Sequence, residues 1–170
     1  MRLTGVVFIV ISAASVGFRI SSLLRKKCRL IEQLLGSLQI MKNEILCCCT
    51  PLPQTFALMA VGVKDAAEKL FSSVAREMDN NRWLSPYAAM EQSIRMVPEI
   101  EGDTVLSEIM LDLASGIGKY DREAQIQIMD RTIIRLEDAL SMALKECSVR
   151  SKTYEVLGIC TGISVAILLI

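Results

Sequence analysis

The chain contains no histidine among its 170 residues. Histidine is the most frequent general base in enzymes and the most frequent protein ligand of metal ions. Its absence excludes Ser–His and Cys–His nucleophile arrangements as well as histidine metal centres. We therefore predict that the protein is not an enzyme, with no catalytic residue, no metal site and no cofactor.

A phosphate-binding loop is also missing. The nearest match is Gly118-Lys119. The P-loop pattern requires Gly at position 113 and Ser or Thr at position 120, whereas the chain has Leu113 and Tyr120. Gly118-Lys119 is therefore interpreted as a helix-ending turn, and the sequence itself shows no means of binding a nucleotide.

Neither charge nor cysteine spacing indicates a specialised ligand. Basic and acidic residues balance at 19 each, which gives no indication of a nucleic-acid partner.

Six cysteines are present, three of them consecutive at Cys47, Cys48 and Cys49. Consecutive side chains on a helix point about 100° apart, so the three consecutive cysteines cannot all face one partner. The spacing fits neither a disulfide framework nor paired CxxC zinc ligands, and we interpret the cysteines as reduced thiols in a reducing compartment.

The first apolar segment begins near the amino terminus. No acidic residue precedes Glu32, and the 16 residues from Leu3 to Phe18 carry no charge. Extended to Leu24, with Arg19 snorkelling to the interface, the segment covers a hydrocarbon core of about 30 Å. We predict a membrane segment over residues 1–24, followed by a basic cytoplasmic flank over 25–29. A signal peptide cleaved near residue 14 is the alternative interpretation.

A second apolar segment lies at the carboxyl terminus. Residues 156–170 are uncharged and Tyr154 is suited to the membrane interface. These 15 residues reach about 22 Å as a helix, so whether the segment spans is left open. Gly158 and Gly162 form a GxxxG pattern that permits close helix packing in lipid, or they are simply two small residues. We predict a membrane segment over 154–170 and a cytoplasmic helical domain over 25–153, with both termini on the far side.

The sequence pattern in the middle of the chain predicts an all-α domain with about six helices and no sheet. Apolar residues recur at spacings of three and four through residues 31–45 and again through 126–147. The other expected features are a helix from Thr50 (N-cap) and Pro51 to Ala60, a helix over 65–80, a helix capped by Ser85-Pro86 that ends near Met96, a connection over 99–103, a helix over 105–117, a turn at Gly116 and Gly118, and a last helix capped by Asp121.

The first and last helices share a heptad pattern. We predict that they pair antiparallel as a stalk of coiled-coil type, with the shorter helices as a head. The heptad faces are expected to pack within one chain, or otherwise to serve self-association or pairing with another protein. Trp83 and Tyr87 flank a helix cap and are interpreted as core or edge anchors, or otherwise as partner contacts.

The order of these features resembles the stage III sporulation protein AB family of endospore-forming bacteria over essentially the whole chain. The resemblance is carried by the apolar start with its basic flank, the run Met41-Lys42-Asn43-Glu44-Ile45, the step Thr50-Pro51-Leu52-Pro53, Gly118 followed by Asp121-Arg122-Glu123 and Gln125, a long charged helix and an apolar tail. Tyr120 departs from the pattern, because a small hydroxyl residue is expected before the aspartate.

The resemblance implies a function that composition does not. The family is similar to the inner-membrane platform protein of type II secretion and type IV pilus systems, and implies a structural component of a channel complex between mother cell and spore. The expected location is the mother-cell membrane facing the spore. The expected partners are a cytoplasmic secretion-type ATPase, other membrane proteins of the complex and membrane lipid; a homo-oligomeric scaffold without ATPase contact is the alternative. The implied partner-binding residues are Glu44, Thr50, Pro51, Pro53, Gly118, Asp121 and Gln125.

Overall fold

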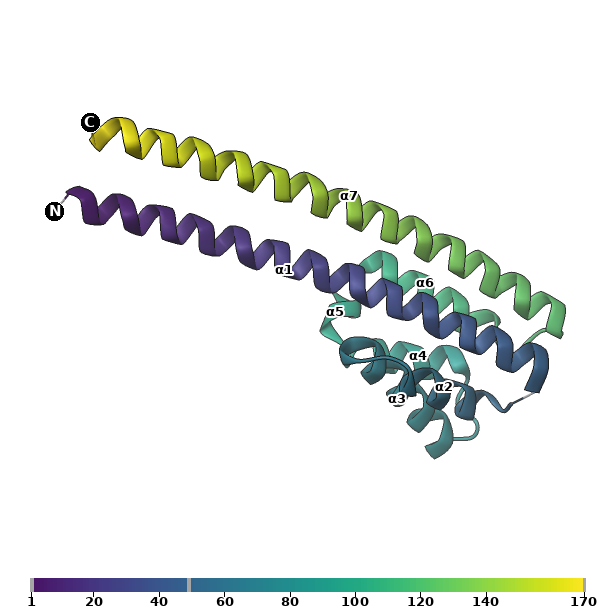
Figure 1. Cartoon of the computed structure of the whole chain (residues 1–170). Helices are drawn as coiled ribbons and strands as arrows, with labels where there is room; N and C mark the ends of the chain where they lie inside the picture. Colours follow the sequence, from purple (N-terminus) through teal and green to yellow (C-terminus); the bar gives the residue numbers. More distant parts are fainter. Residues whose placement is uncertain (1, 49, 170) are drawn as a thin grey trace. The chain divides into compact units, whose positions relative to one another are not determined.

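The computed structural model describes residues 2–48 and 50–169, with side chains over 22–48 and 50–149. Within these residues the chain is all-α and contains no strand, as predicted (Figure 1). The elements in order are α1 (Arg2–Asn43), a one-turn π-helix η1 (Glu44–Cys48), α2 (Leu52–Val61), α3 (Asp65–Asn80), α4 (Pro86–Ile94), α5 (Pro98–Glu101), α6 (Thr104–Gly116) and α7 (Arg122–Leu169).

The chain divides into two compact units. One contains residues 1–28 together with 141–170, and the other contains Arg29–Leu140. The second unit lies inside the predicted helical domain over 25–153. It holds all the short helices, the last turns of α1 and the first turns of α7.

Both long helices are continuous. Helix α1 has 42 residues and joins the predicted apolar segment to the amphipathic stretch without a break. Helix α7 has 48 residues and likewise runs from Arg122 into the apolar tail. Over the residues that the structure describes, no helix is long and apolar enough to cross a membrane. The predicted membrane segments 1–24 and 154–170, with Gly158 and Gly162, lie almost wholly outside the side chains described, and they stay predictions.

The core of the Arg29–Leu140 unit is apolar and closely packed. The heptad face of α1 is fully buried at Ile31, Leu34, Leu38 and Met41. Helix α7 contributes the buried residues Met129 and Leu136, while α2 and α3 meet through the stacked rings of Phe56 and Phe71, 6.4 Å apart. Burying each such side chain stabilises the fold by about 1.5–3 kcal/mol. The apolar periodicity in the two long helices was thus a correct indication of the core, whereas coiled-coil packing as such remains a prediction.

One element differs from the expected connection over 99–103. The short helix α5 occupies Pro98–Glu101 there. Pro98 supplies a helical φ at the first position, and the carbonyl of Val97 accepts hydrogen bonds from the amides of Ile100 and Glu101, both 2.9 Å. Ile100 is fully buried, so a single turn that periodicity cannot detect is stabilised by the core.

A second correction concerns Trp83. Its side chain is 96% exposed, so the interpretation as a core or edge anchor is wrong. Tyr87, on the first turn of α4, is exposed as well. The cap between them was predicted correctly, since the Ser85 hydroxyl accepts a hydrogen bond from the amide of Ala88, 3.2 Å.

Candidate interaction surface

The connection from α1 to α2 begins with a π-helix. The wide turn η1 follows α1 directly and covers Glu44–Cys48. One-turn π-helices in proteins are found frequently at functional sites. The Thr50 hydroxyl donates a hydrogen bond to the Glu44 carboxylate, 2.6 Å, and so closes the connection. Two of the implied partner-binding residues therefore contact each other.

Thr50 does not cap α2, contrary to the sequence prediction. The N-cap of α2 is Pro51, and no side chain accepts a hydrogen bond at this end. Pro53 occupies the second helical position, where a missing amide hydrogen is not needed. The prediction failed because the third helical position after a Thr50 cap would be Pro53, which has no amide hydrogen to donate to the Thr50 hydroxyl.

The connection from α6 to α7 depends on two glycines. Gly116, the last residue of α6, packs so closely on α7 that an added Cβ would lie 2.3 Å from Cδ1 of Ile128. Gly118 has φ +81°, in the left-handed region that favours glycine. An added Cβ at Gly118 would lie 2.9 Å from Cδ1 of Leu52, at the start of α2. The predicted turn is confirmed, and it lies directly against the Thr50–Pro53 step.

Helix α7 starts at a capped end. The Asp121 carboxylate accepts a hydrogen bond from the amide of Ala124, 3.2 Å, which confirms the predicted N-cap. The Gln125 side-chain amide donates to the Tyr120 carbonyl, 2.7 Å, and so fixes the turn that leads into the helix. Tyr120 departs from the family pattern, but this does not disturb the cap, because only its backbone carbonyl takes part in the turn.

The two connections meet in space. The Arg122 guanidinium donates to the carbonyl of Leu46 in η1, 3.4 Å. Two turns further along α7, Asp130 pairs with Lys42 near the end of α1 at 2.5 Å. We call residues 44–48 and 50–53 together with 118–125 the connection surface. It contains all seven implied partner-binding residues, of which Pro51, Gly118 and Asp121 are exposed and the other four are half-buried.

Arg122 is a residue that sequence reasoning missed. Its position in the motif indicates no role, because nothing in the sequence says which backbone carbonyl its guanidinium reaches. The surface consists of helix caps, a tight turn and a mixture of charged and apolar side chains. Over the side chains that the structure describes, no three cysteine or acidic residues are placed to hold a metal ion.

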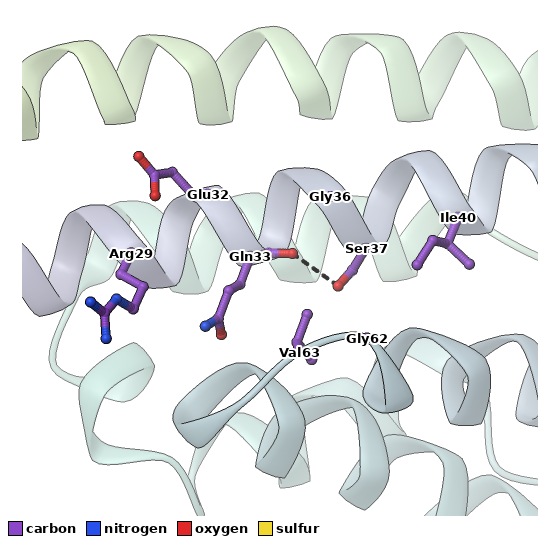
Figure 2. Close-up of a pocket in the computed structure, with 8 residues that line it drawn as sticks. All are labelled: Arg29, Glu32, Gln33, Gly36, Ser37, Ile40, Gly62 and Val63. Carbon is purple, nitrogen blue, oxygen red and sulfur yellow. Dashed lines mark hydrogen bonds between the residues drawn. The ribbon is translucent and has the colours of Figure 1, made fainter.

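A separate groove lies at the C-terminal end of α2, whereas the Thr50–Pro53 step lies at its N-terminal end. It is bounded by α1 and by the link between α2 and α3, and has a volume of about 310 Å³ (Figure 2). Its lining is Arg29, Glu32, Gln33, Gly36, Ser37, Ile40, Gly62 and Val63. None of the residues proposed from sequence lies in it.

Comparison with known proteins identifies the chain's relatives. The family model for stage III sporulation protein AB matches residues 2–170. The chain belongs to the stage III sporulation protein AB family. A stage III sporulation protein AB from Bacillus subtilis (strain 168) is 26% identical over 174 residues, covering 99% of both chains. The family assignment drawn from the sequence motifs is therefore confirmed.

A solved structure of a stage III sporulation protein AB shares the fold. Its TM-score is 0.63 at 24% identity, over 70% of this chain and 94% of that one. This likeness confirms the all-α architecture, which now has independent support from the family's own fold.

Proposed function

We propose that the chain is a structural, non-catalytic component of a sporulation-associated, secretion-like membrane complex, and that its connection surface binds a cytoplasmic secretion-type ATPase. The observation that carries the proposal is the meeting of two motifs more than sixty residues apart in sequence. The Thr50–Pro53 step contacts the Gly118–Gln125 step through Leu52 and Gly118, and the preceding η1 contacts it through Leu46 and Arg122.

The local architecture supports a binding role in addition to a folding role. Hydrogen bonds from side chains hold both connections, so the surface is rigid before any partner arrives. A preorganised surface loses little conformational entropy on binding. Exposed charge at Asp121 and exposed apolar area at Tyr120 (57% exposed) lie next to each other, which is the mixture typical of protein interfaces.

Membrane attachment is the second part of the proposal. The apolar ends 1–24 and 154–170 would anchor the chain in the mother-cell membrane that faces the spore. The basic residues at positions 25–29 and 145–152 would keep the domain between them in the cytoplasm. The continuity of α1 and α7 supports this arrangement, since each helix leads without a break from an apolar end into the Arg29–Leu140 unit.

Co-purification tests the partner. The full chain, extracted in mild detergent with an affinity tag, is expected to retain the secretion-type ATPase of the same complex at micromolar concentrations. The experiment is run with and without nucleotide. Absence of retention in every nucleotide state would refute the ATPase contact and leave the scaffold alternative.

Cysteine labelling tests the membrane topology. All six native cysteines are replaced, and a single reporter cysteine is placed at the carboxyl terminus. An impermeant thiol reagent applied from the non-cytoplasmic side should label that reporter, whereas a reporter at position 96, in the middle domain, should stay unlabelled. The reverse pattern would contradict the topology.

A further inference from the structure

The tip between α3 and α4 presents a tryptophan on a rigid turn. Trp83, the chain's single tryptophan, is 96% exposed. Its own amide donates to the Asn81 side chain, 3.2 Å, and the next amide, that of Leu84, donates to the Asn81 carbonyl, 2.9 Å. The amide of Asn81 in turn donates to Glu77, 3.1 Å. Exposure of the indole is thus imposed by a well-bonded turn.

The groove of Figure 2 is lined by two apolar side chains, two glycines and four polar or charged residues. Val63 and Ile40 point into it, and Gly36 and Gly62 leave it open. An added Cβ at Gly36 would meet nothing within 4 Å. Its volume of about 310 Å³ lies at the small end of the range for ligand pockets, about 300–1,000 Å³, which suits one aromatic side chain.

The tip and the groove lie at opposite ends of one helix. Val63 comes just before α3 and Trp83 just after it. The 16 residues of α3 separate them by about 24 Å. A chain therefore cannot place Trp83 in its own groove, whereas a second copy can.

Each of the two sites carries one acidic and one basic side chain. The tip carries the exposed residues Asp79 and Arg82, and the groove has Arg29 and Glu32 at its rim. Within the described part of the chain, none of these four side chains forms an ion pair. A docked tip offers each rim residue a partner of opposite sign, and Arg29 can also lie over the indole face.

We propose that the protein self-associates head to tail, with Trp83 of one copy inserted into the groove beside Gly36 of the next. Such a contact joins two different surfaces, so it propagates into a ring or an open array. It differs from pairing through the heptad faces of α1 and α7, and it does not depend on ATPase binding. One indole buries about 150–250 Å², well under the roughly 800 Å² per partner of a standard interface, so the association is weak and concentration-dependent.

The fluorescence of Trp83 reports this contact directly in the full chain. In mild detergent, raising the protein concentration should shift the emission to shorter wavelengths and reduce quenching by acrylamide. The Gly36→Phe substitution should abolish both changes because it fills the groove, whereas Gly36→Ala should keep them. Neither substitution threatens the fold, since Gly36 lies inside α1 with open space beside it, and glycine is the weaker helix former.

Mixing two variants tests the head-to-tail geometry. The Gly36→Phe copy keeps its tryptophan but has no groove, and the Trp83→Ala copy keeps its groove but has no fluorophore. Adding the second to the first should restore the emission shift, and sedimentation should show dimers and nothing larger. A wild-type shift that survives Gly36→Phe, no shift at any concentration, or no rescue on mixing would each overturn the proposal. All three outcomes leave the co-purification result unaffected, so the two proposals fail separately.

Discussion

Replacing Gly118 by alanine tests the turn that joins the two halves of the connection surface. The residue has φ +81°, and the left-handed conformation costs a residue with a Cβ about 1–2 kcal/mol. The added methyl group would also lie 2.9 Å from Cδ1 of Leu52. Leu52 is half-buried and must turn away, at about 0.5–1.5 kcal/mol for an unfavourable rotamer. The sum predicts a loss of about 1.5–3.5 kcal/mol in the free energy of unfolding.

The assay is reversible unfolding of the full chain in mild detergent, followed by far-ultraviolet circular dichroism. Repeating Gly118→Ala in a Leu52→Ala background removes the contact and leaves the backbone cost of about 1–2 kcal/mol. Gly62→Ala is the matched control: its φ is −86° and the added Cβ would make an ordinary 3.5 Å contact, so no loss is expected. Equal effects for Gly118→Ala and Gly62→Ala would refute the reasoning.

Two further predictions concern the Arg29–Leu140 unit. The side chains of the Lys42–Asp130 pair are 30% and 48% exposed, so water screens their attraction. A double-mutant cycle should give a coupling energy of only about 0.2–1 kcal/mol, and less at high salt. A larger coupling energy that does not change with salt would contradict this expectation. Leu38→Ala should destabilise the unit by about 2–5 kcal/mol in denaturant titration, because Leu38 is fully buried on the core face of α1; an effect below about 1 kcal/mol would show that this face is not core.

The helices could be predicted from the sequence wherever burial follows a regular period. The α3 boundaries, Asp65 and Asn80, agree with the range predicted from its apolar face and its flanking polar residues. Helix α5 could not be predicted in this way, because its four residues are too few to show a helical period of apolar residues. The burial of Ile100, which only the structure shows, explains why the turn forms. Trp83 was misassigned because an aromatic residue beside a cap is usually packed, and only the turn geometry turns this one outward.

The residues of the candidate surface could be predicted from the sequence, but the contact between its two segments could not. Sequence order identifies the Thr50–Pro53 and Gly118–Gln125 steps separately. Their contact depends on Arg122 reaching the Leu46 carbonyl and on Gly118 packing against Leu52, which are tertiary events. The Asp121 cap was predicted correctly because the amide of Ala124, at the third helical position, donates to it. The Thr50 cap was predicted wrongly because the equivalent position is Pro53, which has no amide hydrogen.

Asp121→Asn measures most directly whether the connection surface binds the ATPase. Asparagine caps a helix about as well as aspartate, so the substitution keeps the α7 cap and removes only the charge. Asp103→Asn is the matched control, because Asp103 caps α6 through an equivalent 3.2 Å bond to the amide of Leu106, outside the connection surface. In titrations of the ATPase against the full chain in nanodiscs, we predict that Asp121→Asn weakens binding by about tenfold or more, equivalent to about 1.4 kcal/mol, and that Asp103→Asn leaves it unchanged. Equal affinities for the wild type and both variants would contradict the account.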